Sequence, residues 1–282
     1  MKKIGLVTIV DYTNYGNRLQ NYAAQQVLRS LGCDVVTIVN EQLVSGTVVG
    51  KRSLIKRLFG LNVGALWRRM VRSVHKKKRD LVTKSKHDKL KKFSSSHIRE
   101  SDFVIRVDDI PADLSDAFDA FVVGSDQVWN PRFRKGSPID FLRFTERAKR
   151  VSYSASFGVS EIPSQYRDSY QTWLSEFAHL SVREDSGADI IRQLTGSEAA
   201  VLYDPTLMLD KDQWLSISSV SMLKPRGAYL LTYFLGGISK EVEQLISRLV
   251  KEHHLEVVHL GSFKQMNRYD TDLSIPSLLS AH

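Results

Sequence analysis

The chain has 282 residues, 42% of them hydrophobic, and a single cysteine, Cys33. This length and composition suit one large or two modest globular domains, and they exclude a disordered or fibrous protein and an intrachain disulfide framework. The formal net charge of +9 is unevenly spread, because residues 51–99 hold 17 lysines and arginines against two acids, Asp80 and Asp88. One basic segment is therefore joined to a mildly acidic remainder.

The start of the chain has the pattern of a strand, a helix and a second strand. Residues 3–10 are mostly apolar, residues 18–31 carry apolar side chains at spacings of three and four, and residues 34–39 are rich in β-branched side chains. Gly32 is a suitable helix stop. A unit of this kind typically begins a parallel, doubly wound α/β sheet.

Residues 51–99 interrupt this pattern. Their apolar residues recur at roughly helical spacing, so they are predicted to form an inserted, basic helical region. The β pattern then resumes. Strands are predicted at residues 121–123, 151–154, 180–182 and 200–203, and helices at residues 166–177 and 185–194.

A connector rich in serine, with lysine, proline and glycine, is the predicted linker at residues 218–227. Beyond it, residues 229–260 repeat the strand, helix and strand pattern. The stretch 228–282 is too short for a complete second sheet with helices on both faces. The sequence therefore predicts an α/β protein with an N-terminal Rossmann-like domain over residues 1–217 and a truncated second one over residues 228–282.

Polar residues follow the first predicted strand and continue into the predicted helix. Such a turn places backbone N–H groups and the positive end of a helix at the mouth of the sheet, which suits an anion or sugar hydroxyls. The candidate ligand-binding residues are Asn14, Gly16, Asn17 and Gln20. An equally weighted alternative is that the asparagines and the glycine only make the turn and cap the helix.

The predicted strand at residues 121–123 breaks into a polar turn at its carboxyl end, where ligands bind in open α/β sheets. Asp126 is a candidate base or hydroxyl-orienting group, and Trp129 offers an apolar plate for a sugar. The alternative is an aspartate that caps a turn and a tryptophan in the core. The density of polar groups favours a binding segment, whose candidates are Gly124, Ser125, Asp126, Gln127, Trp129 and Asn130.

Two further strand ends carry suitable groups. Ser154 and Ser156 are small hydroxyl residues after one strand, and Arg183 follows the next, where its planar guanidinium suits a carboxylate or phosphate. Arg183 could instead pair with the acidic residues that follow it. Asp204 precedes a proline and is predicted to belong to a structural turn.

The sequence predicts no metal site, because none of the eight histidines has metal-ligand spacing with carboxylates. Glycine-rich phosphate-binding motifs and a GxSxG nucleophile motif are also missing from the sequence.

The basic segment 51–99 has three interpretations. A solvated basic helix is the commonest, an anionic membrane surface is the favoured partner, and nucleic acid is the least favoured because no nucleic-acid fold signature accompanies the charges. No window of about 18 apolar residues occurs. The chain is therefore expected to be cytoplasmic, with peripheral contact at the inner face of the membrane as the alternative.

Five segments, in this order, resemble motifs of the polysaccharide pyruvyl transferase family: YTNYGNRLQNYA, FVVGSDQVWNP, YSASFG, SVRED and YDPTLML. Members resemble glycosyltransferases of the two-Rossmann-domain B type. Characterised members transfer a pyruvyl group from phosphoenolpyruvate to sugar hydroxyls of cell-surface glycans or their lipid-linked precursors and form a ketal. The resemblance implies this fold, this donor and this class of acceptor, with no separate cofactor.

The resemblance also implies that Arg183 helps to hold the donor, and we expect Asp126 on the acceptor side. Members carry a Ser-Phe-His-Gly or similar motif in the second domain, whose histidine is associated with donor binding and catalysis. No such motif occurs here: His259 precedes Leu-Gly-Ser, and His282 is the last residue. We therefore expect part of the donor site to be missing, and the activity of this chain stays open, as do the acceptor sugar, the product stereochemistry and the oligomeric state.

Two other functions fit the same residues. One is a sugar-nucleotide glycosyltransferase on the same architecture, since a fold does not settle the chemistry. The other is a module without catalytic activity that docks on anionic surfaces through residues 51–99.

Overall fold

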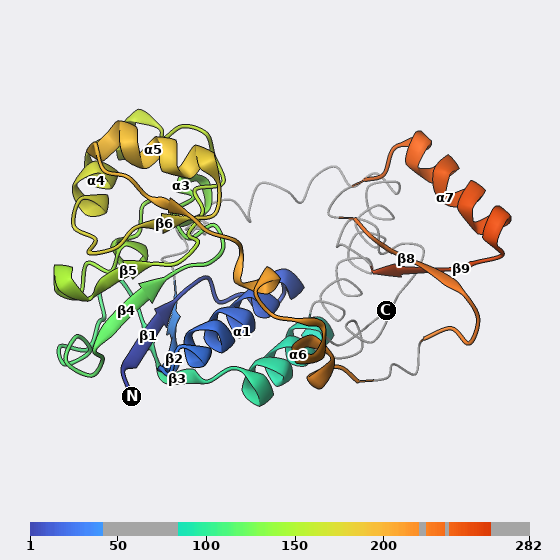
Figure 1. Cartoon of the computed structure of the whole chain (residues 1–282), viewed down its shortest axis with the longest axis horizontal. Helices are drawn as coiled ribbons and strands as arrows, with labels where there is room; N and C mark the ends of the chain where they lie inside the picture. The colour runs from blue at the N-terminus through green and yellow to red at the C-terminus, as the bar shows by residue number, and fades with distance from the viewer. Residues whose placement is uncertain (42–83, 220–223, 235–236, 261–282) are drawn as a thin grey trace, which may run out of the picture. The chain divides into compact units, whose positions relative to one another are not determined.

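The computed structural model describes residues 1–41, 84–219, 224–234 and 237–260 (Figure 1). These residues belong to two compact units. The first unit takes in the described part of residues 1–49 and 91–211, and the second takes in the described part of residues 50–90 and 212–282. Most of the predicted basic insertion lies outside the described residues, but residues 84–97 form a helix, as the sequence predicts for the end of that segment.

The first unit is built on a parallel sheet whose strand order is β3-β2-β1-β4-β5. The predicted α/β class with a parallel central sheet is therefore confirmed. Strand β3 was not predicted, because it is a partly exposed edge strand of sequence ESDFVI whose polar residues hide its β pattern. The five strands are β1 (Lys3–Val7), β2 (Asp34–Asn40), β3 (Glu100–Ile105), β4 (Ala120–Val123) and β5 (Arg150–Ser152).

A second parallel pair, β6 (Ser181–Val182) and β7 (Ala200–Val201), continues the sheet beyond β5. The amide of Ala155 donates to the carbonyl of Ser181, and the amide of Arg183 donates to the carbonyl of Ala155. The resulting strand order is that of a doubly wound sheet. All strands are parallel, but the order in which they follow one another across the sheet reverses between β1 and β4. That reversal is the topological switch point, where such folds bind ligands.

The side chains of the strands alternate between two apolar clusters, one on each face of the sheet. Ile4 and Leu6 of β1 pack with Ala24 and Leu28 of α1 (Tyr15–Ser30). Val7, on the opposite face, belongs to the larger core that also includes residues of α4 (Ser164–Leu174) and α5 (Asp185–Thr195). Figure 1 shows α1 alongside β1 and β2, and α4 and α5 near β6.

Short elements complete the first unit around the ends of the strands. None of the described helices is long and apolar enough to cross a membrane. The short elements of the first unit are α3 (Pro131–Arg134), η1 (Pro138–Phe141), η2 (Arg147–Lys149) and η3 (Pro205–Leu207). Helix α6 (Lys211–Ser216) begins at the last residue of the first unit, and the rest of it belongs to the second unit.

The second unit contains a strand, helix and strand repeat, as the sequence predicts. Strands β8 (Tyr229–Tyr233) and β9 (Glu256–Leu260) are parallel and are joined by α7 (Lys240–His253). Ser239 caps the helix through the amide of Val242, and His254 ends it with a left-handed φ of 52°. A serine cap and an apolar stripe mark this helix in the sequence, which is why the repeat could be predicted.

The backbone at the end of β4 packs closely against the end of β5. Gly124 has a φ of +121°, and a Cβ atom there would lie 2.2 Å from the carbonyl oxygen of Tyr153. A backbone atom cannot move away as a flexible side chain would. Only glycine therefore fits between β4 and the polar turn that follows it.

We expect Gly124→Ala to lower the free energy of unfolding by more than about 3 kcal/mol, since it adds a backbone clash to an unfavourable φ. Gly32→Ala is the matched control, because Gly32 also has a positive φ (+78°) but has no atom within 4 Å of its Cβ position. That control should cost only about 1 kcal/mol. Equal losses for the two variants in chemical denaturation would show that the close approach of β4 and β5 is not a constraint.

Candidate functional site

The carboxyl ends of five parallel strands bring together the segments that the sequence analysis singled out. These segments follow β1, β4, β5, β6 and β7 and meet through hydrogen bonds between residues far apart in the chain, such as Thr8 to Ser125 and Asn17 to Asp126. We call this set of turns the carboxyl edge. Its segments are residues 8–17, 124–130, 153–158, 183–185 and 202–206.

Asp126 lies at the switch point in an unusual backbone conformation, with a φ of 73°. Its Oδ2 accepts a hydrogen bond of 2.8 Å from Nδ2 of Asn17, and its Oδ1 accepts one of 2.7 Å from the amide of Gln127. The residue is half-buried, and both carboxylate oxygens accept a hydrogen bond from the protein. Two donated hydrogen bonds fix its orientation.

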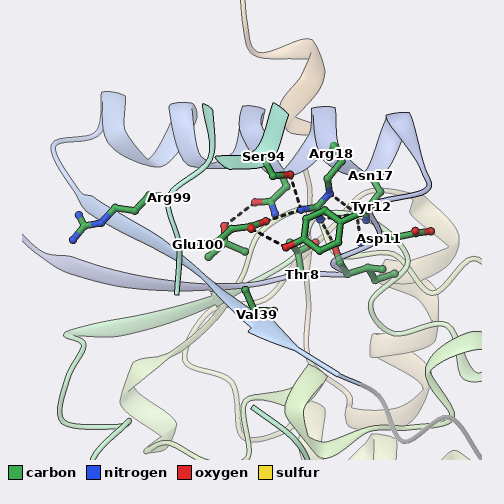
Figure 2. Close-up of polar contacts among 12 residues, drawn as sticks. Thr8, Asp11, Tyr12, Asn17, Arg18, Val39, Ser94, Arg99 and Glu100 are labelled. Carbon is green, nitrogen blue, oxygen red and sulfur yellow. Dashed lines mark hydrogen bonds and ion pairs between the residues drawn. The ribbon is translucent and has the colours of Figure 1, made fainter. Parts of the chain in front are cut away.

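Asn17 holds Asp126 from the first turn of α1, and its own amide is tightly held (Figure 2). Its Oδ1 accepts from the amide of Asp11 (2.9 Å) and from Nε (3.1 Å) and Nη2 (2.7 Å) of Arg18. Asn14 accepts from the amide of Asn17 and caps the helix, as the structural alternative predicted for it. Gly16 is exposed in the same turn.

Behind the edge lies a buried polar chain that links α1 to the turn after β4. Nε2 of Gln20 donates to Oγ1 of Thr8 (2.8 Å), and Oγ1 of Thr8 donates to the carbonyl of Ser125 (3.1 Å). Oε1 of Gln20 is buried and accepts no hydrogen bond from the described residues. Gln20 therefore supports the edge from the inside and is not open to a ligand in the way that Asp126 is.

Asp204 is the centre of a second cluster, which the sequence analysis took for a simple turn. Its Oδ2 accepts from Oγ of Ser125 (3.0 Å) and from Nη1 of Arg183 (2.9 Å), and its Oδ1 accepts from both the amide and the hydroxyl of Thr206. Nε of Arg183 donates to Glu184 (2.8 Å). The acidic residue before Pro205 was visible in the sequence, but its partners lie 21 and 79 positions away.

Charges within this cluster stabilise one another. Burial raises the pKa of Asp204, but hydrogen bonds from Thr206, Arg183 and Ser125 outweigh it and hold the pKa below its ordinary value. Burial lowers the pKa of Arg183, yet Glu184 and Asp204 more than compensate, so the pKa is raised. Arg183 is thus a permanent cation whose charge is already balanced by two carboxylates.

Several predicted ligand-binding residues are buried, among them Ser125, Trp129, Ser154 and Ser156, which have no exposed surface. Trp129 is fully buried, its Nε1 donates to the carbonyl of Asp140 (2.8 Å), and its ring stacks on Phe141. The prediction of an exposed sugar-stacking plate is therefore wrong, because the ring is fully buried against Phe141, Phe157 and Phe177 of the core. The side chains of Ser154 and Ser156 are also fully buried, and they bond to the backbone of Leu202 and Gly158 respectively.

The two remaining side chains of the polar turn differ in burial. Asn130 is buried, caps α3 through the amide of Arg132, and donates to the side chain of Gln127 (2.7 Å). Gln127 is half-buried at the edge. Gly158 lies against both amides, since a Cβ atom there would be 2.5 Å from Oε1 of Gln127.

Most of the partly exposed charged groups of the carboxyl edge are carboxylates, which accept hydrogen bonds. Asp11, Asp126, Glu184 and Asp204 are carboxylates, against the single guanidinium of Arg183. Among the described residues, no group of three or more histidines, cysteines and acids could hold a metal ion. The edge is chemically suited to accept hydrogen bonds or a proton from ligand hydroxyls, with one arginine for an anionic group.

Comparison with protein-family models shows one match, to the family described as polysaccharide pyruvyl transferase, over residues 14–279. The match begins at the helix cap Asn14, continues through the first unit and extends beyond β9. Comparisons with curated proteins and with solved structures gave no match.

The Asp204 cluster makes a prediction for stability against pH. Because its folded pKa lies below the ordinary value of 3.8, the stabilisation by ionised Asp204 is complete above that pH and is lost as the pH falls through the folded pKa. We expect Asp204→Asn to lower the free energy of unfolding at neutral pH by about 1 to 3 kcal/mol. The difference in the free energy of unfolding between Asp204→Asn and the wild type should shrink only below about pH 4.

Asp189→Asn is the control, because Asp189 pairs with Arg192 on the surface with 56% of its side chain exposed. Asp189→Asn should change the free energy of unfolding by nearly zero, as for most exposed ion pairs. If the difference between wild type and Asp204→Asn already disappeared near neutral pH, Asp204 would not be the stabilised carboxylate described above.

Proposed function

Because the chain belongs to the polysaccharide pyruvyl transferase family, we propose that it transfers a pyruvyl group from phosphoenolpyruvate to a sugar of a cell-surface glycan or its precursor, forming a ketal. Membership of the family indicates a transferase of polysaccharide biosynthesis with a glycan acceptor. The observation that supports the finer proposal is the Asn17–Asp126 pair, an oriented carboxylate at the switch point of a doubly wound sheet.

On this proposal Asp126 acts on the acceptor. One oxygen of its carboxylate can accept the proton of a sugar hydroxyl while hydrogen bonds from Asn17 and Gln127 hold the group in place. The carboxylates that surround it suit neutral hydroxyls, which donate hydrogen bonds. They are less suited to a free anion, which they would repel.

The proposed reaction joins two acceptor hydroxyls to one donor carbon. The first hydroxyl oxygen bonds to C2 of phosphoenolpyruvate while C3 gains a proton and becomes a methyl group. The second hydroxyl oxygen then bonds to C2, and the C2–O bond to phosphate breaks. The two hydroxyl protons are thereby accounted for: one matches the proton gained at C3, and the other leaves with phosphate.

Arg183 is our candidate for the donor. Its side chain is about one-quarter exposed (26%) at the end of β6, where the guanidinium could bind a carboxylate or a phosphate. Since Asp204 and Glu184 already bind it, an anionic donor must compete with one of them or use the remaining N–H groups. This arrangement predicts a donor affinity that is modest and depends on Arg183.

The second unit fits the proposed architecture. Its β8–α7–β9 repeat has the connectivity with which a Rossmann-like domain begins, as expected for a glycosyltransferase of the B type. The proposed contact of residues 51–99 with an anionic membrane surface rests on charge alone, and most of that segment lies outside the described residues.

The activity can be tested with phosphoenolpyruvate labelled with ¹³C at C2 and a panel of lipid-linked and oligosaccharide acceptors. We expect phosphate release together with a ¹³C signal of a ketal carbon. Release of nucleoside diphosphate from sugar nucleotides, with no ketal and no binding of phosphoenolpyruvate, would instead indicate a glycosyltransferase and contradict the proposal.

In that assay we expect Asp126→Asn to lower kcat by about a hundredfold or more, as for loss of a general base. Asp119→Asn is the matched control, since Asp119 precedes β4 at the opposite edge of the sheet and accepts from the amide of Lys3. An active wild type with unchanged kcat in Asp126→Asn would remove Asp126 from the reaction.

For the donor, we expect Arg183→Gln to weaken phosphoenolpyruvate binding about tenfold or more in calorimetry, the effect of losing a charge-assisted hydrogen bond. Arg192→Gln is the control, because Arg192 also binds two carboxylates, Asp189 and Glu198, but lies on the exposed surface of α5. Equal donor affinity in Arg183→Gln and the wild type would show that Arg183 only supports Asp204.

A further inference from the structure

Arg18 is an arginine with no exposed surface, located in the first turn of α1. Five hydrogen bonds leave its guanidinium, to Oδ1 of Asn17 from both Nε and Nη2, to the carbonyl of Ile9, to Glu100 and, at 3.5 Å, to Ser94 (Figure 2). Burial of a charged group is costly unless it is paired and fully hydrogen-bonded. The free-energy cost of burying Arg18 indicates that this cation has a specific role in the fold or the site.

The charge of Arg18 is balanced by a residue from a distant part of the chain. Nη1 lies 2.9 Å from Oε1 of Glu100, the first residue of β3, and Oε2 of Glu100 accepts from the hydroxyl of Tyr12 (2.8 Å). The Tyr12 ring lies over the guanidinium, with 5.2 Å between the ring centre and Cζ. Glu100 and Tyr12 thus enclose Arg18 and leave its Nε and Nη2 side directed at Asn17.

This enclosure determines which way the Asn17 amide faces. An asparagine amide can be reversed by rotation, which exchanges its acceptor and its donors. Here Oδ1 receives three hydrogen bonds, two of them from a cation, so the reversed orientation would place the NH₂ group against the guanidinium and the Asp11 amide. Nδ2 must therefore point away from Arg18, toward Oδ2 of Asp126.

We infer that Arg18 is a positioning residue that fixes the amide of Asn17 and, through it, the carboxylate of Asp126 at the carboxyl edge. The inference rests on the proposed function, since it concerns the same Asp126. Arg18 contacts no reacting group itself. It acts through an amide whose N–H is a stronger donor because its oxygen is bound to a cation.

A purely structural role would give Arg18 a different set of partners. Arg150 shows such a role: it is buried at the amino end of β5, donates to the carbonyl of Thr145 and to Glu176, and reaches no residue of the carboxyl edge. Three of the five bonds of Arg18, in contrast, end on Asn17 and Ile9, which belong to segment 8–17 of the carboxyl edge. Arg150→Lys is therefore the matched control for Arg18→Lys.

The first test does not require activity. In the ¹⁵N-labelled wild type, the Nδ2 signals of Asn17, identified by their loss in Asn17→Ser, should shift when Asp126 is changed to Asn. In Arg18→Lys the same Asp126→Asn change should no longer shift them, whereas in Arg150→Lys it should. An Asp126-dependent shift that survives in folded Arg18→Lys would overturn the inference.

The second test is a double-mutant cycle on kcat. We expect Arg18→Lys to lower kcat about tenfold with little change in KM, because lysine cannot make the paired bonds to Oδ1 of Asn17. Combined with Asn17→Ser, it should add little further loss, since both changes remove one interaction. Additive losses would show that Arg18 does not act through Asn17.

If Arg18→Lys does not fold, Glu100→Gln replaces it in both tests. Glutamine keeps the shape of Glu100 but removes the negative charge that holds Arg18. In Glu100→Gln, the Asp126→Asn change should shift the Nδ2 signals of Asn17 less than it does in the wild type, and a shift of the same size would count against the inference. A wild type without pyruvyl transfer would contradict the proposed function alone, because the amide test would still decide the role of Arg18.

Discussion

The hydrogen bond between Asn17 and Asp126 joins the two turns that flank the reversal of strand order in the first unit. One turn follows β1 and opens α1, and the other follows β4, so the two residues are 109 positions apart in the chain. The parallel sheet brings these turns to the same edge, and the close approach of Gly124 to the backbone of Tyr153 fixes the direction in which the β4 turn leaves the sheet. The position of Asp126 thus depends on the register of β1, β4 and β5 together.

Charge is distributed over the edge in two separate clusters. Around Asn17, a buried arginine is compensated by Glu100, so its field acts mainly through the amide it holds. Around Asp204, the side chain of Arg183 is about one-quarter exposed (26%) and is shared between two carboxylates. The first arrangement suits a rigid support, and the second suits an arginine that exchanges partners when an anion arrives. On the proposed function, the first cluster would serve the neutral acceptor and the second the anionic donor.

Most elements could be predicted from the sequence, because their signals are local. The bounds of α7 follow from its serine cap and apolar stripe, and α1 begins three residues earlier than predicted only because its cap, Asn14, was assigned to the turn. The strand β3 could not be found, since an edge strand needs few apolar residues. Trp129 and Arg18 could not be placed, because their burial depends on Phe141 and Glu100, which the fold alone brings near. Which polar residue faces a ligand is decided by such distant partners.

The central claim is that a glycan acceptor binds at the carboxyl edge with a hydroxyl on Asp126. A crystal structure with an acceptor glycan bound tests this most directly. The account predicts an acceptor hydroxyl within hydrogen-bonding distance of the Asp126 carboxylate, with the bond from Asn17 to that carboxylate retained. An acceptor bound elsewhere, with Asp126 in contact only with protein groups, would contradict it.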